Sequence, residues 1–393
     1  MSQCVDRSSK IVEAFEDPPV REHSGRNRLV LGAICLAVLC IILSLGLWPF
    51  HAPRNEVTWL RDSNGLSFGR SGTVVSSDAL SATTGETCCS IEIWAQPHPY
   101  LSSATVLSFY TPENPHQLGL NQSLTDFTLQ AMVPNGPDRA TKASLQVAEV
   151  FRHAEPVFIT VTSGRHGTAV YVAGALAKTV PQLRIPKSAF AGRILLGDSP
   201  LQPNSWYGQV RGLAIYDAEL TAQHALLHYR TWTKNGRPEV AEDERPIALY
   251  LLDEHSGNVV HSQIKSGVNL YIPERYFVLD KLFMEPFWQE FEMSRSFWSA
   301  VMKNIVGFVP FGFCFYPYFS ARQGRWAMLF TIAGGTIVSL TIEVLQAFLP
   351  TRDSGMMDII TNTLGTWGGV LLYQRVYPLL AERFPWLPFA PVR

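Results

Sequence analysis

The feature that most constrains this chain is a run of 22 residues without a charged side chain, from Leu29 to Phe50. A helix of that length extends about 33 Å, enough to cross a hydrocarbon core of about 30 Å. A cleavable signal peptide is the alternative. We favour a retained membrane anchor, because Pro49 and Pro53 follow the run and no small-residue cleavage motif does.

Three further apolar stretches come late in the chain, and aromatic residues near their ends suit a membrane interface. They are Asn304–Ala321, Trp326–Ile342 and Ile359–Gln374. With the first run they predict about four transmembrane helices, the later three at about 297–319, 326–349 and 356–377. Arginines before the first span, between the second and third, and after the fourth fall on one side if the spans alternate. That side is expected to be the cytoplasm of a bacterial cell, reached by tails at 1–28 and 379–393.

The segment between the first and second spans has a different pattern and is expected to lie outside the cytoplasm. From Val57 to about Trp232, short alternating stretches are separated by Gly, Pro, Asn and Asp, which is typical of an antiparallel β-sandwich. The predicted strands are Ser90–Ala95, Thr105–Tyr110, Asp126–Val133, Val157–Thr162, Ala169–Val172, Arg193–Gly197 and Gly208–Tyr216. The fold class is therefore a multidomain membrane protein that joins an all-β sandwich to an α-helical bundle.

The sandwich segment resembles the laminin-G-like, or concanavalin A-like, jelly rolls. The phrases that carry the resemblance are SIEIWAQP, VFITVTSGRHGTAVYVAGALAKT, RILLGDS and WYGQVRGLAIYDAELTAQHALLHY, in that order. The resemblance covers about residues 51–235 and implies two packed curved sheets, of a kind often used to bind glycans or other proteins. Residues 236–296 are interpreted as a connector with extra strands. Those near 248–277 either complete the sandwich or bridge it to the membrane.

Composition and spacing exclude several kinds of partner. With 32 basic and 33 acidic residues, the chain has no net positive field to attract nucleic acid. No cysteine or histidine spacing indicates zinc, and His98, His116, His153 and His166 are expected at the surface or in turns. Asp198 and Asp217 could contribute to a calcium site of the kind some such sandwiches carry, but a structural role in turns is favoured. No metal site and no cofactor are assigned, although a divalent cation bridging carboxylates is left open.

The last hundred residues concentrate polar side chains in or beside the predicted spans, where each is costly unless it has a partner or a function. Glu343 and Gln346 share one face of the third predicted helix, and Asp358 and Asn362 share one face of the fourth. Pro350 ends the third helix, and the short turn after it would let Arg352 fold back toward Glu343 or Asp358. We expect these groups to line one shared, outward-facing recess.

This region resembles the VanZ-like membrane protein family. The matching blocks are NIVGFVPFGF, from Asn304 to Phe313, and IEVLQAFLPTRDSGMMDIITNTLGTWGG, from Ile342 to Gly369. The resemblance covers about residues 297–378. It implies a small helical membrane protein of the cell envelope and, through the family's namesake, an influence on susceptibility to teicoplanin. The large inserted sandwich departs from the minimal form of the family.

The leading hypothesis is a pocket that binds an anionic lipid headgroup or a lipid-linked envelope precursor, while the sandwich holds a glycan or an envelope protein. Glu343, Asp358 and Arg352 are the catalytic candidates if the pocket is an active site. Asn304, Gln346, Ser354 and Asn362 are the ligand-binding candidates. Asp358 could equally be a residue favoured by the helix dipole, Ser354 a helix cap, and Arg352 an anchor to lipid phosphate.

Other functions remain open at this level. An acid/base hydrolase or transferase on a phospholipid or lipid carrier is the first alternative, although no nucleophile motif such as GxSxG is present. The second is a non-enzymatic envelope adhesin or scaffold, and a transporter is a weaker third. Membrane lipids are expected partners in every case. The sequence decides neither whether the protein is an enzyme nor its oligomeric state.

Overall fold

The computed structural model describes residues 20–81, 89–100, 102–134, 140–265, 267–290 and 295–383. Contacts divide the chain into two compact units. The sandwich unit comprises Pro49–Leu282 and Leu349–Asp353, and the helical unit comprises the described parts of Met1–Trp48, Phe283–Phe348 and Ser354–Arg393. The predicted tails lie largely outside the described residues.

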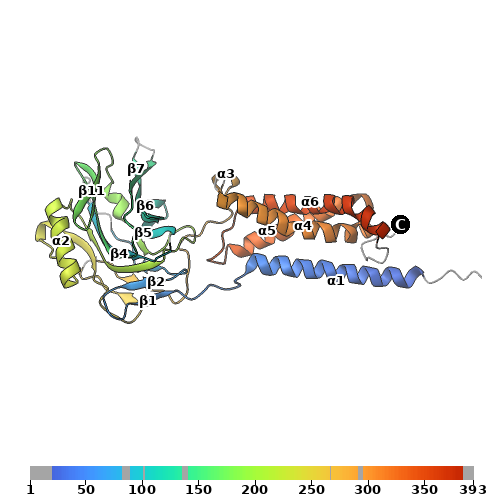
Figure 1. Cartoon of the computed structure of the whole chain (residues 1–393), viewed down its shortest axis with the longest axis horizontal. Coiled ribbons are helices and arrows are strands. Elements are labelled where there is room, and N and C mark those ends of the chain that lie inside the picture. The colour runs from blue at the N-terminus through green and yellow to red at the C-terminus, as the bar shows by residue number, and fades with distance from the viewer. Residues whose placement is uncertain are drawn as a thin grey trace, which may run out of the picture. The chain divides into compact units, whose positions relative to one another are not determined.

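The sandwich unit consists of two antiparallel sheets (Figure 1). The first has the strand order β1-β2-β13-β4-β9-β10-β11, with β14 also paired to β13, and the second has the order β15-β16-β3-β12-β5-β6-β7-β8. The strands are β1 (Val57–Trp59), β2 (Leu66–Phe68), β3 (Val74–Ser76), β4 (Cys89–Pro97), β5 (Ser103–Thr111), β6 (Asn114–Ser123), β7 (Asp126–Pro134), β8 (Ala140–Val147), β9 (Val157–Gly164), β10 (Gly167–Val172), β11 (Ala175–Val180), β12 (Arg193–Leu196), β13 (Gly208–Tyr216), β14 (Pro246–Tyr250), β15 (Val259–Val260) and β16 (Leu270–Tyr271).

The strands that follow residue 245 complete the sandwich. β14 pairs with β13 in the first sheet, and β16 pairs with β3 in the second. Of the two roles considered for residues 248–277, the structure therefore shows the first. The all-β sandwich predicted from the sequence is confirmed, and the structure adds strands that were not predicted, among them β6 and β8.

Alternation along the strands builds the core between the two sheets. On β7, Phe127 and Leu129 are fully buried, while the intervening Thr128 and the following Gln130 face the other side of the sheet. On β13, Leu213 and Ile215 belong to the same core, whereas Ala214 and Tyr216 belong to a second buried cluster. The first sheet is therefore covered on both faces along β13.

Helix α2 (Ala222–Asn235) covers the outer face of the first sheet, as Figure 1 shows. Thr221 caps its first turn by accepting a hydrogen bond from the backbone N–H of His224, and Gly236 ends it in the left-handed conformation at φ 73°. The fully buried Trp232 packs on Gly212, where a Cβ atom would lie 2.4 Å from the indole ring. Short 3₁₀ turns at η1 (Lys187–Phe190) and η2 (Glu242–Glu244) lie before and after this helix in the chain.

Among its described residues, the helical unit contains four long helices and one short one; Figure 1 labels them. They are α1 (Val20–Leu47), α3 (Phe287–Glu290), α4 (Arg295–Gln323), α5 (Ala327–Gln346) and α6 (Met356–Arg383), with the 3₁₀ turn η3 (Gly324–Trp326) between α4 and α5. Within the described ranges, three segments are long and apolar enough to cross a membrane: Arg28–Leu47, Phe297–Ala321 and Gly324–Gln346. The last long helix, α6, has 28 residues but carries more polar groups, and it is not one of these three candidate spans.

Glycines set the close packing of α6. A Cβ atom on Gly365 would lie 2.2 Å from the carbonyl oxygen of Ile305, and one on Gly369 would lie 2.1 Å from that of Val309. These pairs are four residues apart on both helices, so one face of α6 lies directly on the α4 backbone. Gly368, on another face of α6, has nothing within 4 Å of the same position.

Candidate functional site

The predicted polar cluster in the helical unit is centred on Glu343, which is 1% exposed near the end of α5. Its Oε2 accepts a hydrogen bond of 2.9 Å from the backbone N–H of Gly355, and the Ser354 hydroxyl donates to the Glu343 carbonyl at 2.9 Å. The carboxylate therefore binds a backbone amide immediately before α6, where negative charge is favourable.

The remaining predicted side chains form separate contacts. Asn304 on α4 donates to the Asp358 carboxylate at 2.7 Å, and Asn362 on α6 donates to the Ser339 hydroxyl on α5 at 2.9 Å. Asn362 is 5% exposed, and its Oδ1 has no hydrogen-bond partner among the described residues. The α4–α6 and α5–α6 interfaces thus each contain a polar pair.

Gln346 and Arg352 are the other two predicted members. Gln346 donates from Nε2 to the carbonyl of Gly46 on α1 at 2.8 Å, so it faces a different neighbour from Glu343. Arg352 belongs to the turn Leu349–Asp353, which groups with the sandwich unit. Within that unit, Lys281 Nζ donates to the Leu349 carbonyl at 2.6 Å. The structure therefore joins Glu343 to Ser354 and Asn304 to Asp358.

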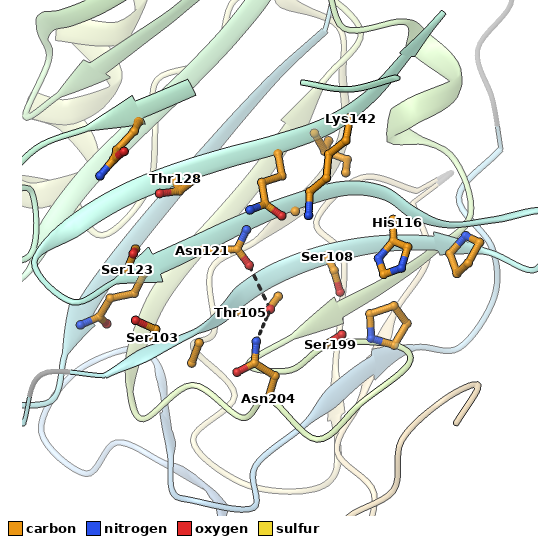
Figure 2. A pocket seen from close by; sticks show the side chains of 18 residues that line it. Ser103, Thr105, Ser108, His116, Asn121, Ser123, Thr128, Lys142, Ser199 and Asn204 are labelled. Atoms are coloured by element: carbon orange, nitrogen blue, oxygen red, sulfur yellow. Dashed lines mark hydrogen bonds between the residues drawn. The ribbon is translucent and has the colours of Figure 1, made fainter. Parts of the chain in front are cut away.

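A second candidate site is a cleft of about 490 Å³ in the sandwich unit, on β5, β6, β7 and β8 (Figure 2). Its lining is dominated by hydroxyl and amide groups, and the residues labelled in Figure 2 are Ser103, Thr105, Ser108, His116, Asn121, Ser123, Thr128, Lys142, Ser199 and Asn204. Many neutral donors and acceptors on an open sheet face suit a hydroxyl-rich ligand.

Internal hydrogen bonds orient the amides of this cleft. The Thr105 hydroxyl donates to Asn121 Oδ1 at 3.0 Å and accepts from Asn204 Nδ2 at 3.2 Å, as the dashed lines in Figure 2 show. The amide nitrogen of Asn121 is thereby left as a donor toward the cleft. The buried Asp198 accepts the backbone N–H groups of Ser199 and Asn204, both at 2.8 Å, and so holds the turn that carries them. Burial raises the pKa of Asp198 to about 6.

Two basic residues share this cleft. Burial, and then the charge of Lys142, lower the pKa of His116 below 6.5, so its imidazole is neutral at pH 7. His116 lies on β6, its side chain is exposed as predicted for a surface histidine, and it also lines the cleft. The strand was missed because Pro115 and Gly119 interrupt it, although the buried Leu118 and Leu120 carry its alternation.

A third polar cluster, which sequence reasoning missed, is buried under α2. His228 is 0% exposed, with Nδ1 2.9 Å from Glu92 Oε2 and Nε2 3.2 Å from Glu244 Oε1. Tyr216 donates to the same Glu92 oxygen at 2.8 Å, and Thr160 donates to the other at 3.1 Å. Because the His228 side chain has no exposed surface, a ligand cannot reach it, and the cluster has a structural role: it attaches α2 to the first sheet. We call this cluster the clamp.

The two aspartates weighed as calcium ligands have other contacts. Asp217 pairs with Lys187 Nζ at 2.6 Å, and Asp198 holds its turn as described. No group of three or more His, Cys, Asp or Glu side chains in the described ranges could hold a metal ion.

Comparison with known proteins identifies the carboxyl-terminal region. Residues 249–378, which are 130 of the 393 residues, match the VanZ/LLP1 family model. The predicted VanZ resemblance is confirmed there, and the match begins earlier than residue 297, within the last strands of the sandwich. No curated protein matches the chain.

Solved structures that resemble this chain do so only at low sequence identity and low TM-score. The binding domain of Paraclostridial Mosquitocidal Protein 1 is 10% identical with a TM-score of 0.36, over 46% of this chain and 47% of that one. A candidate carbohydrate binding protein from Bacteroides ovatus is 11% identical with a TM-score of 0.38, over 54% and 58%. A SAP-like pentraxin from Limulus polyphemus is 14% identical with a TM-score of 0.35, over 56% and 95%. The chain thus spans about half the length of the first two proteins. Similarities this weak assign no function.

Proposed function

We propose that this protein is a membrane-anchored saccharide-binding protein of the bacterial cell envelope. The VanZ-like helical unit holds it in the cytoplasmic membrane, and the sandwich faces outward, consistent with arginines at the opposite ends of the spans. The observation that carries the proposal is the cleft on β5–β8, whose floor presents hydroxyl and amide groups held in place by Thr105 and Asp198. Such groups match the alternating donors and acceptors of sugar hydroxyls.

Gly119 offers a direct test, because it lies on the cleft floor. A Cβ atom there would meet only the Asn121 side chain within ordinary reach, at 3.4 Å, and the Leu107 carbonyl at 4.0 Å. A leucine at this position would therefore project into the cleft without disturbing the core. We expect Gly119→Leu to weaken saccharide binding by the detergent-solubilised full chain at least about tenfold, a loss of about 1.4 kcal/mol.

The measurement is binding to an oligosaccharide array, followed by calorimetry on the oligosaccharides that bind. Thr58→Leu, at an exposed position on β1 of the other sheet, is the matched control and should leave affinity unchanged. Equal affinity of wild type and Gly119→Leu would refute the cleft as the binding site.

For the helical unit we propose a second role, the binding of a lipid-linked envelope precursor, and with it an influence on teicoplanin susceptibility. The observation that favours it is the buried Asn362 Oδ1 without a donor, since an unpaired buried acceptor costs about 1–3 kcal/mol and a lipid hydroxyl could supply the missing proton. Native mass spectrometry should show precursor lipid on the wild type, and on Thr341→Val, but not on Asn362→Leu. Retention by Asn362→Leu would contradict this role.

A further inference from the structure

The cleft on β5–β8 has an uneven charge composition. Lys142 and His116 are its ionisable side chains, and no Asp or Glu is among the described residues that line it. A second cleft in the same unit, of about 450 Å³ near Tyr171, contains Glu219. Unlike this second cleft, the first has no carboxylate among the described residues that line it.

Lys142 is placed to act on a ligand. It lies on β8, the last strand of its sheet, and Figure 2 shows its ammonium group pointing into the cleft, as the side chain of Asn121 does. In the part of the chain that the structure describes, Lys142 forms no ion pair. Its charge also contributes, after burial, to lowering the pKa of His116, which lines the same cleft.

Donors and charge together favour an anion at this part of the cleft. An ammonium group that points into the same cleft as the side chain of Asn121 can form charge-assisted hydrogen bonds with carboxylate or phosphate oxygens. The neutral hydroxyls and amides toward Ser103 and Asn204 would then contact the uncharged part of the ligand. An unpaired ammonium group gives a neutral sugar much less additional binding energy.

We propose that the saccharide bound in this cleft is anionic, with its carboxylate or phosphate group held by Lys142 and Asn121. This inference rests on the proposed saccharide-binding function and specifies its ligand class. It predicts selectivity for acidic over neutral oligosaccharides of the same length, and a decline in affinity as salt screens the exposed ammonium group.

The experiment compares wild type, Lys142→Gln and Gly119→Leu as full chains in detergent. The probes are an array of neutral, carboxylated and phosphorylated oligosaccharides. For each carboxylated oligosaccharide that binds, its methyl ester serves as a probe of nearly equal shape without the charge. We expect wild type to prefer the acid over the ester about tenfold, and Lys142→Gln to bind both equally at the weaker affinity. Carboxylated and phosphorylated arms distinguish the two sources of charge.

The outcomes separate this inference from the proposed function. If neutral oligosaccharides or methyl esters bind as tightly as the acids, and Gly119→Leu still abolishes binding, the cleft binds saccharide but the anionic class is wrong. If Lys142→Gln keeps the preference for acids, the assignment of Lys142 is wrong. If no oligosaccharide in the array binds to wild type, the proposed function and the inference fail together.

Discussion

Replacement of His228 by leucine should destabilise the attachment of α2 to the first sheet. In the native protein the imidazole lies between two buried carboxylates, Glu92 on β4 and Glu244 on η2. Burial by itself lowers the pKa of His228, but the hydrogen bond and charge of Glu92, together with those of Glu244, outweigh it and raise the pKa above 6.5. The positive imidazolium is therefore the form that the clamp favours.

The expected loss is about 3 kcal/mol. Removing one partner from a buried ion pair typically costs about 3–5 kcal/mol, because the opposite charge stays buried and uncompensated. The lower end applies here, since Glu92 would keep hydrogen bonds from Tyr216 and Thr160, and Glu244 would keep one of 2.7 Å from the backbone N–H of Ala241. Because the folded-state pKa is raised, the stabilisation is complete below about pH 6.5 and is lost as the pH rises through the native pKa.

Hydrogen–deuterium exchange of α2 peptides in the detergent-solubilised full chain measures this directly. In the regime where exchange reports local opening, 3 kcal/mol corresponds to roughly 100-fold faster exchange for Ala222–Asn235. His224→Leu is the matched control: its Nδ1 lies 3.5 Å from the same Glu244, but its side chain is 29% exposed, so we expect a loss below about 1 kcal/mol. Equal protection of α2 in wild type and His228→Leu at pH 6 would refute the reasoning.

Three further predictions follow from contacts already described. Gly365→Ala should lower the melting temperature in detergent, because its Cβ would clash with a backbone carbonyl of α4. The control Gly368→Ala should be neutral or stabilising by up to about 1 kcal/mol, because nothing lies near its Cβ position. Equal melting temperatures of the two variants would contradict the packing of α6 on α4. Glu343→Ala should destabilise the helical unit by about 1–3 kcal/mol in thermal melts, while Glu343→Gln should retain most of the stability, because an amide oxygen can still accept from Gly355. Binding of an acidic oligosaccharide should strengthen in calorimetry as the pH falls through the lowered pKa of His116, since its protonation adds a second cation to the cleft, and His116→Gln should remove this dependence.

The architecture could be predicted from the sequence because its signals are long. Uncharged stretches such as Leu29–Phe50 predict spanning helices with few alternatives, and regular alternation on β4, β9 and β13 predicts a sandwich. α6 gave a weaker signal: its polar residues sit at helix interfaces, as Asn362 does against Ser339, so composition understates how closely the helix packs in the bundle.

The cleft and the clamp could not be predicted because both depend on pairing between distant strands. Lys142 and Asn121 are brought to one face by the pairing of β6 with β7 and of β7 with β8, and neither β6 nor β8 has an unbroken apolar alternation. His228 and Glu92 are 136 residues apart in sequence, and only the packing of α2 on the first sheet joins them. Helical spacing cannot reveal a contact of that kind.

The contacts of α5 bear on where an anion can bind. Residues i and i+3 are about 60° apart around a helix, which is enough for Glu343 to face the start of α6 while Gln346 faces α1. Glu343 therefore already supplies a negative charge to the amide of Gly355, and an anionic headgroup at that place would have to displace a buried carboxylate or bind beside it. The cleft on β5–β8 imposes neither cost, because its described lining contains a lysine and no acid. On electrostatic grounds, recognition of an anion is thus better assigned to the sandwich, and a neutral hydroxyl is the better ligand for Asn362.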